Sequence, residues 1–251
     1  MSGISKDRIY EHLNNNIKVF TYDTIDSTND EAKRYLRAGL DANALFISCE
    51  QTKGRGRQGK MFYSPKNTGL YMSVVLIGDK IPSTLFITTA VSVIVSNAIE
   101  GCCGVSPLIK WVNDLYLRDK KICGILTEAV RDGNGEIIGV IVGIGINVNT
   151  DFFPDELDKI ATSVGCDADY NKLAAIITNK LICGELDNNK LYIDDYKNKS
   201  MVIGQEITYF RNNTEYCGKA IDINSDGALI VQTNDGLVSL DSGEITIRVK
   251  K

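Results

Sequence analysis

Hydrophobic positions in the first part of the chain alternate in some segments and recur with helical spacing in others. Alternating and short apolar runs predict strands. Ser27, followed by Asp30 and Glu31, predicts the start of a helix that ends near Gly39, and the long apolar run after Pro82 predicts a buried helix. The predicted elements are strands over 17–22, 44–48 and 70–77 and helices over 27–39 and 82–99.

The middle of the chain continues this mixture. Polar and glycine-containing turns separate its apolar segments, which is typical of antiparallel hairpins. The predicted elements are paired strands over 108–117 and 121–130, a further strand over 137–148, and two or three helices between 155 and 199. Long apolar helices combined with such strands predict an α/β or α+β fold in which helices flank a mixed β-sheet.

The chain changes character near Ser200. From Val202 onward, short apolar segments alternate with turns, and a small all-β barrel of roughly five strands is expected. The turns are predicted at 211–213, 225–227 and 234–236. We therefore predict two domains, one over 1–200 and one over 201–251.

Composition limits the classes of function. The chain has 251 residues, of which 43% are hydrophobic and 24% charged, as in an ordinary globular protein. A net charge of −4 and a pI near 5.2 argue against a general nucleic-acid binder. Residues 1–11 contain no apolar signal segment, so we expect a cytoplasmic protein that does not bind a membrane.

Histidine and cysteine usage narrows the chemistry further. His12 is the only histidine, which argues against a Ser-His-Asp triad and against metal sites built from several histidines. The seven cysteines show no zinc-binding spacing, and Cys102 and Cys103 are adjacent. We interpret all seven as buried, reduced thiols.

Residues 54–60 read Gly-Arg-Gly-Arg-Gln-Gly-Lys and concentrate cations on a glycine-rich backbone. Arginine binds phosphate through two hydrogen bonds, and glycine lets main-chain N–H groups approach an anion closely. In an acidic protein this favours a small phosphate-bearing ligand, with a solvated basic loop as the alternative. The segment also fits the G-x-G-x-x-G dinucleotide pattern, but we reject that interpretation because 61–65 reads as extended rather than helical.

Four polar segments lie at the ends of predicted strands. Each has an ordinary structural explanation of its own: a helix cap, a solvated turn or a close crossing of two backbones. The segments are Ser27-Thr28-Asn29, Gln51 with the loop 54–60, Lys110 to Asp114 with Lys121, and Gly143 to Asn147.

Taken together, in this order, the segments resemble the biotin protein ligase family, that is, biotin–[acetyl-CoA-carboxylase] ligases, over nearly the whole chain. The family motifs S-T-N, G-R-G-R-x-G, K-W-P-N-D, K-x-x-G-I-L-x-E and G-x-G-I-N-x-N all have counterparts here. Val112 stands where the family usually has proline, and Phe62 where tryptophan is common. The resemblance implies a catalytic domain like those of class II aminoacyl-tRNA synthetases and biotin–lipoyl ligases, followed by an SH3-like C-terminal domain.

The resemblance also implies a two-step reaction. Biotin and ATP give biotinyl-5′-AMP and pyrophosphate, with Mg²⁺ held mainly by the substrate phosphates and no protein ligand assigned to it. A lysine of a biotin carboxyl carrier domain then receives the biotinyl group. The implied catalytic residues are Lys121, Arg55, Arg57 and Asp114. The implied biotin-binding residues are Ser27, Thr28, Asn29, Gln51, Arg55, Gly56, Arg57, Lys121 and Gly124. The implied ATP- and adenylate-binding residues are Arg55, Arg57, Phe62, Lys110, Asn113 and Asn147.

Expectations about partners follow from the same resemblance. Family members occur with or without an N-terminal DNA-binding domain, and a first strand near Ile17 leaves no room for one, so we expect the monofunctional form without DNA binding. Both monomers and homodimers are compatible with the sequence. Two alternatives stay open: a lipoate ligase or octanoyltransferase, which shares the catalytic fold, and a non-catalytic module that binds an adenine nucleotide.

Overall fold

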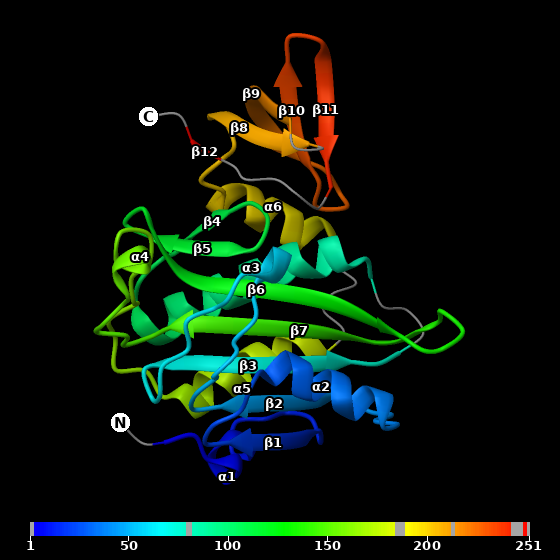
Figure 1. Cartoon of the computed structure of the whole chain (residues 1–251), viewed down its shortest axis with the longest axis vertical. Helices are drawn as coiled ribbons and strands as arrows, with labels where there is room; N and C mark the ends of the chain where they lie inside the picture. Colours follow the sequence, from blue (N-terminus) through cyan, green and yellow to red (C-terminus); the bar gives the residue numbers. More distant parts are fainter. Residues whose placement is uncertain (1–2, 79–81, 184–188, 212–213, 242–247, 250–251) are drawn as a thin grey trace.

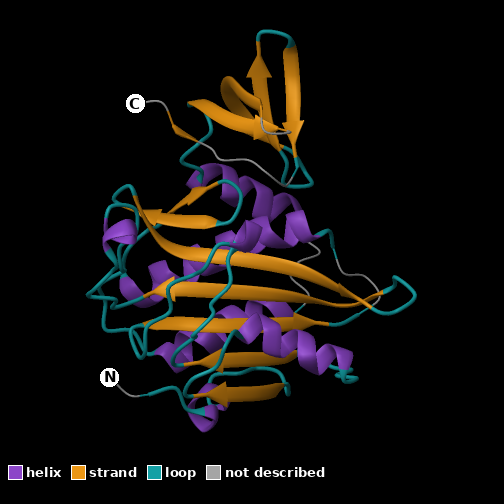
Figure 2. Ribbon diagram, viewed as in Figure 1, coloured by secondary structure: helices purple, strands orange, loops and turns teal. Residues whose placement is uncertain are grey.

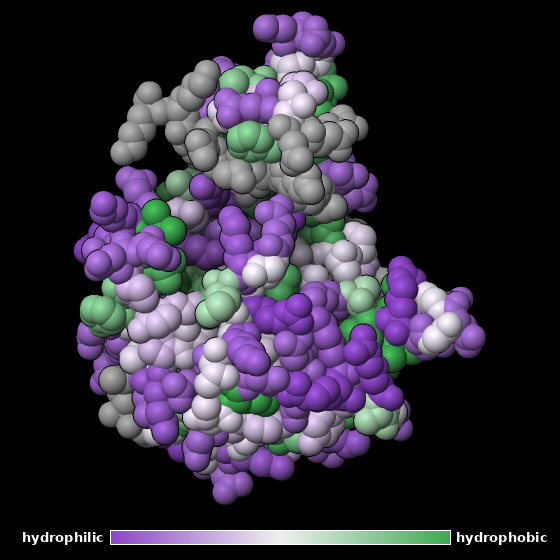
Figure 3. All heavy atoms as spheres, in the orientation of Figure 1, coloured by the Kyte–Doolittle hydropathy of each residue, from purple (hydrophilic) through white to green (hydrophobic). Residues whose placement is uncertain are grey.

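The computed structural model describes residues 3–78, 82–183, 189–211, 214–241 and 248–249. A seven-stranded sheet is built from the first part of the chain and a five-stranded sheet from the last part. Helices cover both faces of the larger sheet, and the smaller sheet lies beyond α6 (Asn189–Lys199) at one end of the molecule (Figures 1 and 2). On the face shown in Figure 3, hydrophilic residues predominate and apolar residues form only small groups.

The larger sheet is mixed, as predicted. β1 and β2 are parallel, and every other neighbouring pair is antiparallel. In sheet order the strands are β1 (Lys18–Tyr22), β2 (Ala44–Ser48), β3 (Gly69–Leu76), β7 (Ile137–Asn147), β6 (Lys120–Arg131), β5 (Asp114–Leu117) and β4 (Leu108–Lys110). The single strand expected over 108–117 is in fact two, because the chain turns back at residues 111–113.

Alternation along β2 explains why the centre of this sheet is buried on both faces. Leu45 and Ile47 belong to the main hydrophobic core with α3 (Thr84–Cys103) and α5 (Tyr170–Ile182), whereas Phe46 belongs to a smaller core under α2 (Thr28–Arg37). The smaller core also contains Ala32 and Leu36 of α2, a helical i, i+4 pair. Two short helices complete the unit, α1 (Lys6–Tyr10) and α4 (Asp155–Asp158), of which α1 was not predicted from the sequence.

Among the described residues, α3 is the one helix long and apolar enough to cross a membrane by length and composition. Most of it is buried inside the fold, where residues such as Ile87, Val91 and Ile99 have no exposed surface. It packs along the larger sheet, on the side opposite α2 (Figure 1). This burial is what a core helix requires.

The smaller sheet is entirely antiparallel, and its five strands match the number expected. In sheet order they are β11 (Gly236–Leu240), β10 (Leu229–Thr233), β9 (Thr214–Ile223), β8 (Glu206–Arg211) and β12 (Arg248–Val249). The turns predicted at 225–227 and 234–236 both connect neighbouring strands. The third predicted turn includes residues 212–213, which lie outside the described residues.

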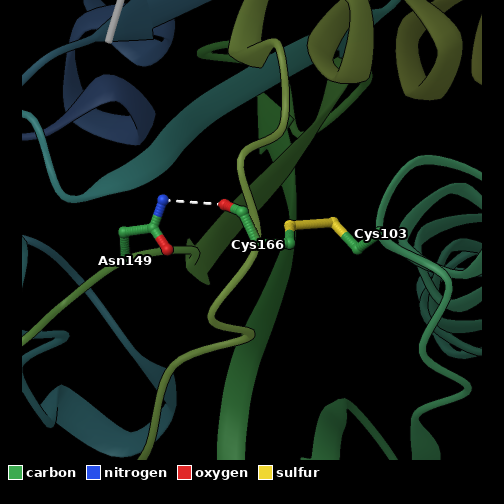
Figure 4. Close-up of a disulfide and its surroundings, with 3 residues drawn as sticks. All are labelled: Cys103, Asn149 and Cys166. Atoms are coloured by element: carbon green, nitrogen blue, oxygen red, sulfur yellow. Dashed lines mark hydrogen bonds between the residues drawn. A yellow bond between two sulfur atoms is a disulfide. The ribbon is translucent and has the colours of Figure 1, made fainter.

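The expectation that all seven cysteines are reduced and buried is wrong. Cys103, at the end of α3, forms a disulfide with Cys166, which follows β7 by a long connection (Figure 4). Cys183 and Cys217 are free but exposed. The pairing joins residues 63 positions apart, a proximity that only the packing of α3 against this connection creates.

Candidate active site

One cavity, with a volume of about 470 Å³, opens on the side of the larger sheet that carries α2 and the loop 54–64. Every residue that the sequence assigned to the site lines it. These residues are Ser27, Thr28, Asn29, Gln51, Arg55, Gly56, Arg57, Phe62, Lys110, Asn113, Asp114, Lys121, Gly124 and Asn147. The structure thus brings these residues together, while their roles in catalysis and in ligand binding stay predictions.

Glycines form the floor of the cavity and give the G-x-G spacing its physical reason. Gly143 and Gly145 are two positions apart on β7 and so face the same side, and Gly124 of β6 is directly opposite Gly145. A Cβ atom on Gly143 would lie 2.1 Å from Asn29 Oδ1, and one on Gly145 would lie 2.5 Å from the Phe62 ring. Only glycine therefore lets these two side chains lie on the sheet.

A network of uncharged groups surrounds the start of α2. Ser27 caps the helix, since its side chain accepts a hydrogen bond from the Asp30 amide. The amide and the hydroxyl of Thr28 both donate to Gln51 Oε1, at 2.9 and 3.1 Å. Gln51 in turn donates to Ser64 Oγ at 3.0 Å. The role of Ser27 as a helix cap is therefore compatible with a binding role for this segment, because the cap fixes the first turn of α2, which carries Thr28.

Asn29 is held by residues that the sequence did not assign to the site. Its Nδ2 donates to Glu128 Oε2 at 2.9 Å, and its Oδ1 lies 2.6 Å from the hydroxyl of Ser73. Lys33 completes the arrangement with an ion pair of 2.7 Å to Glu128. Ser73 has no exposed surface and lies inside the apolar strand β3. Its place in an apolar segment was the signal that could have revealed this contact, because a buried hydroxyl requires a hydrogen-bond partner.

The Arg-Gly loop is folded back on itself rather than extended into solvent. Gly56 N donates to Lys60 O at 2.7 Å, and Phe62 N donates to Gly54 O at 3.0 Å. Gly54 is buried, and a Cβ atom there would lie 2.4 Å from Phe62 O. A short 3₁₀ turn, η1 (Arg57–Gly59), takes the place of the helix that a dinucleotide-binding turn requires. The rejection of that motif is thus confirmed.

The two arginines of the loop lie in different environments. Arg55 is half-exposed and forms an ion pair with Asp30, whose hydrogen bond raises the pKa of the guanidinium. Arg57 is largely buried in the cavity wall, where its Nη1 donates to Asn113 Oδ1 at 3.3 Å. Burial lowers the pKa of Arg57, and the nearby carboxylate of Asp114 opposes that effect. Arginine stays protonated in such a site, so Arg57 presents a fixed, partly desolvated cation to the cavity.

The neighbouring strands β4, β5 and β6 supply the rest of the charged wall, through Lys110, Asp114 and Lys121. Lys121 Nζ lies 2.6 Å from Asp114 Oδ1 across the β5–β6 hairpin. Lys110 Nζ lies 5.3 Å from the centre of the Tyr116 ring, and burial lowers the pKa of this lysine. Asn113 Nδ2 donates to Ile125 O of β6 at 2.8 Å. This bond fixes the side chain whose Oδ1 accepts the hydrogen bond from Arg57.

Asn147 ends β7 at the same cavity. The residue is 4% exposed, and its Nδ2 donates to Thr162 O at 3.2 Å. Its Oδ1 is buried without a hydrogen-bond partner among the described residues. An unsatisfied buried acceptor in a cavity wall is a group that a ligand N–H can satisfy.

Known proteins are similar to this chain in fold and in sequence. A solved structure of biotin protein ligase from Aquifex aeolicus in complex with biotin and ATP matches with a TM-score of 0.81 and 27% identity, covering 93% of this chain and 99% of that one. The bifunctional ligase/repressor BirA of Bacillus spizizenii is 33% identical over 90% of this chain and 72% of its own length. The biotin–[acetyl-CoA-carboxylase] ligase of Mycobacterium tuberculosis is 27% identical over 87% of this chain and 85% of its own.

Two family profiles divide the chain in the same way as its two sheets. The biotin/lipoate A/B protein ligase family matches residues 21–147, and the C-terminal domain of biotin protein ligases matches residues 202–248. The chain belongs to the biotin/lipoate A/B protein ligase family.

Proposed function

We propose that this chain is a biotin–protein ligase that activates biotin with ATP and attaches it to a lysine of a biotin carboxyl carrier domain. The observation that carries the proposal is the lining of a single cavity. Uncharged hydrogen-bonding groups, the Thr28–Asn29–Gln51 network, and the cationic groups of Arg57 and Lys121 face the same space. Relatives that align with most of this chain are named biotin–[acetyl-CoA-carboxylase] ligases or BirA ligases.

The uncharged network suits the ureido ring of biotin, which carries one carbonyl acceptor and two N–H donors. Ser73 Oγ lies 2.7 Å from Thr28 Oγ1 and 2.6 Å from Asn29 Oδ1, but a hydroxyl has only one proton to donate. Of the two acceptors, Thr28 Oγ1 and Asn29 Oδ1, one is therefore available to a ligand N–H. The amides and hydroxyls bind without a net charge, as a neutral ring requires.

The glycine floor suits the aliphatic chain of biotin. Gly124, Gly143 and Gly145 carry no side chains, so the Asn29 side chain and the Phe62 ring lie close to the sheet, and the ring gives an alkyl chain an apolar surface to lie against. An alkyl chain along the floor leads from the uncharged network toward Lys121, whose Nζ would lie 3.2 Å from a Cβ atom on Gly124. The biotin carboxylate would thus reach the cationic wall.

In the first step a biotin carboxylate oxygen attacks the α-phosphorus of ATP. A new P–O bond forms, the bond to the oxygen that bridges to the β-phosphate breaks, and pyrophosphate leaves with that electron pair. Lys121 and Arg57 stabilise the negative charge that builds up on the α-phosphate oxygens. Arg55 joins them when it exchanges its ion pair with Asp30 for a phosphate.

Mg²⁺ fits this scheme as a companion of ATP rather than as a resident ion. Asp114 is the only carboxylate in the cavity lining, and it is paired with Lys121. The described residues contain no cluster of three or more His, Cys, Asp or Glu side chains. Phosphate oxygens and water supply most ligands of nucleotide-bound Mg²⁺, which neutralises charge on the phosphates. Asp114 is the one residue placed to approach it.

The nucleotide would lie against the remaining wall. Asn147 Oδ1 suits an adenine N–H donor, and Asn113 is a second group able to bind the adenine edge. Lys110 provides a partly desolvated cation for the phosphates, and the Phe62 ring provides an aromatic surface for the base.

In the second step the neutral ε-amine of the acceptor lysine attacks the carbonyl carbon of biotinyl-5′-AMP. A C–N bond forms, the bond between that carbon and the phosphate oxygen breaks, AMP leaves, and the amine nitrogen loses a proton. The folded Arg-Gly loop supports this step by covering a reactive anhydride until the acceptor arrives. We assign the catalytic unit to residues 1–200 and an SH3-like barrel to 201–251, supported by the five antiparallel strands and the matching C-terminal profile.

The proposal is tested by incubating the protein with ATP and Mg²⁺ together with biotin or, separately, lipoate. Pyrophosphate release and the mass of a carrier protein with a single acceptor lysine are then followed. Biotin-dependent release with addition of one biotinyl group supports the proposal. Turnover with lipoate alone would assign the chain to the other branch of the family, and nucleotide binding without turnover would mean a non-catalytic module.

A further inference from the structure

The cavity wall is hydrogen-bonded to the smaller sheet through the only tryptophan of the chain. Trp111 lies between the predicted site residues Lys110 and Asn113 and lines the cavity. Its indole Nε1 donates a buried hydrogen bond of 2.9 Å to Gly227 O, which belongs to the turn between β9 and β10. The two residues are 116 positions apart, so this contact joins the two sheets of the molecule.

The backbone next to Trp111 is supported from behind by two helices. Val112 O accepts hydrogen bonds from Tyr196 of α6 at 3.2 Å and from Ser92 of α3 at 3.4 Å. Neither Tyr196 nor Ser92 has exposed surface. The peptide bond between Trp111 and Val112 is cis, a form otherwise found almost only before proline. Apart from the indole bond, these supports all come from the catalytic unit.

The turn that accepts the indole bond is itself fixed. Asn224 Oδ1 accepts hydrogen bonds from the amides of Asp226 at 3.0 Å and Ala228 at 2.8 Å. Gly227 has φ = +89° and packs on α3, where an added Cβ atom would lie 2.8 Å from Thr89 Cγ2. The turn is therefore both conformationally defined and pressed against the catalytic unit. In Figure 1 the smaller sheet stands next to α6, the helix that carries Tyr196.

From this geometry we infer that Trp111 is a positioning residue through which the smaller sheet holds the Lys110–Asn113 turn in place for ATP. The inference rests on the proposed function, because it assigns this turn to the nucleotide side of the cavity. The smaller sheet then contributes to ATP binding through this hydrogen bond, and none of its described residues lines the cavity. The uncharged network around Thr28 and Gln51 has no contact of this kind with the smaller sheet among the hydrogen bonds of the described residues, so biotin binding is unaffected.

Two variants break the connection from opposite ends. Trp111→Phe keeps a ring in the wall but removes the N–H donor. Asn224→Ala releases the turn from the far side and leaves the cavity lining intact. Thr233→Ala is the matched control, because Thr233 Oγ1 organises the other turn of the same sheet, with bonds of 2.9 and 3.2 Å to the backbone at Gly236 and Asp235.

Steady-state pyrophosphate release is measured for each variant while ATP and biotin are varied in turn. Trp111→Phe and Asn224→Ala are expected to raise the KM for ATP by about 3–10-fold, the effect of one lost neutral hydrogen bond, and to leave the KM for biotin unchanged. Thr233→Ala is expected to change neither. Unchanged ATP kinetics in both test variants, or equal changes in both KM values, would overturn the inference.

Tryptophan fluorescence gives a second readout that requires no turnover, since all the signal comes from Trp111. ATP is titrated without biotin into the wild type, Asn224→Ala and Thr233→Ala. The expected result is an emission change on ATP binding in the wild type and the control, with the titration shifted to higher ATP in Asn224→Ala. Identical titrations for all three proteins would overturn the coupling. A wild type that shows this response but no biotin-dependent pyrophosphate release would instead refute the proposed function.

Discussion

Lys121 Nζ and Asp114 Oδ1 lie 2.6 Å apart, on facing strands of one hairpin. Both side chains are largely shielded, with 31% and 25% of their surfaces exposed. The carboxylate balances the lysine charge in the free protein. Asp114 also holds the Lys121 ammonium above Gly124, where the biotin carboxylate and the α-phosphate of ATP would meet. A lysine fixed in this way reorganises little when charge develops in the transition state, which is the condition for electrostatic catalysis.

Lys121→Gln is therefore expected to lower kcat for biotin-dependent pyrophosphate release by about 10²–10³, the typical effect of losing one preorganised stabilising group. Lys120→Gln is the matched control, because Lys120 donates to Asp158 O on the surface and does not line the cavity. Single-turnover rates and melting temperatures are measured for both. Equal losses in the two variants would show that the hairpin, rather than the Lys121 charge, had been disturbed.

The floor of the cavity gives a second prediction. In Gly143→Ala the new Cβ atom would lie 2.1 Å from Asn29 Oδ1, so Asn29 must leave its contacts with Ser73 and Glu128. The KM for biotin is expected to rise by about tenfold or more, corresponding to one or two lost hydrogen bonds, while the KM for ATP stays the same.

Gly133→Ala is the control for that substitution, since nothing lies within 4 Å of a Cβ atom there. Isothermal titration with biotin checks the affinity directly. A Gly143→Ala variant that binds biotin as tightly as the wild type would remove Asn29 from the biotin site.

The site residues were assigned from the family resemblance, whereas parts of the local structure around them could be predicted from the sequence pattern alone. Two glycines at i and i+2 must face the same side of a strand, and a serine followed by acidic residues must cap a helix. Gly143, Gly145 and Ser27 are found in these roles. The strands on either side were predicted to within a few residues for the same reason.

Other groups depend on contacts between distant segments, and no local pattern reveals them. Ser73 looks like an ordinary position in β3 until α2 places Asn29 against it. Trp111 reads as part of a motif, but its partner at Gly227 lies in the other sheet. The Cys103–Cys166 disulfide was missed because a cytoplasmic protein was expected from the sequence, and thiols are usually reduced in that compartment.

Lys110 gives a prediction that links stability to function. Burial lowers the pKa of its ammonium below the ordinary value of 10.5, so the folded protein bears a cost for keeping it charged at neutral pH. Lys110→Met is expected to raise the melting temperature and also the KM for ATP. Each 1 kcal/mol of stabilisation corresponds to about 2–4 °C for a domain of this size. Lys159→Met, at an exposed position, should leave both unchanged.

The difference in stability between Lys110→Met and the wild type depends on pH, and the direction of that dependence follows from the lowered pKa of Lys110. Between the lowered pKa and 10.5, Lys110 binds fewer protons in the folded than in the unfolded state, so the stability of the wild type rises with pH there. The advantage of Lys110→Met is therefore full below the lowered pKa and disappears as pH approaches 10.5. Denaturant unfolding of both proteins from neutral to alkaline pH measures it. A gap that widened toward alkaline pH would contradict the burial of a charged Lys110.

The disulfide between Cys103 and Cys166 gives the last prediction. It closes a loop across 63 positions, and in the chain-entropy account such a bond contributes up to about 4 kcal/mol. The segment before Cys166 also reaches the site: Thr162 O accepts from Asn147, and the backbone of Lys121 is bonded to Ile160 and Thr162. Reduction is therefore expected to lower the melting temperature and to raise the KM for ATP.

Cys103→Ser separates this effect from a general response to reductant. The variant should resemble the reduced wild type and should not change when reductant is added. Cys183→Ser, which removes an exposed free thiol, should keep the full response of the wild type. Thiol alkylation followed by mass spectrometry, before and after reduction, counts the cysteines released. If all seven cysteines were alkylated without reductant under denaturing conditions, the wild type would lack this bond, and its melting temperature would then not respond to reductant.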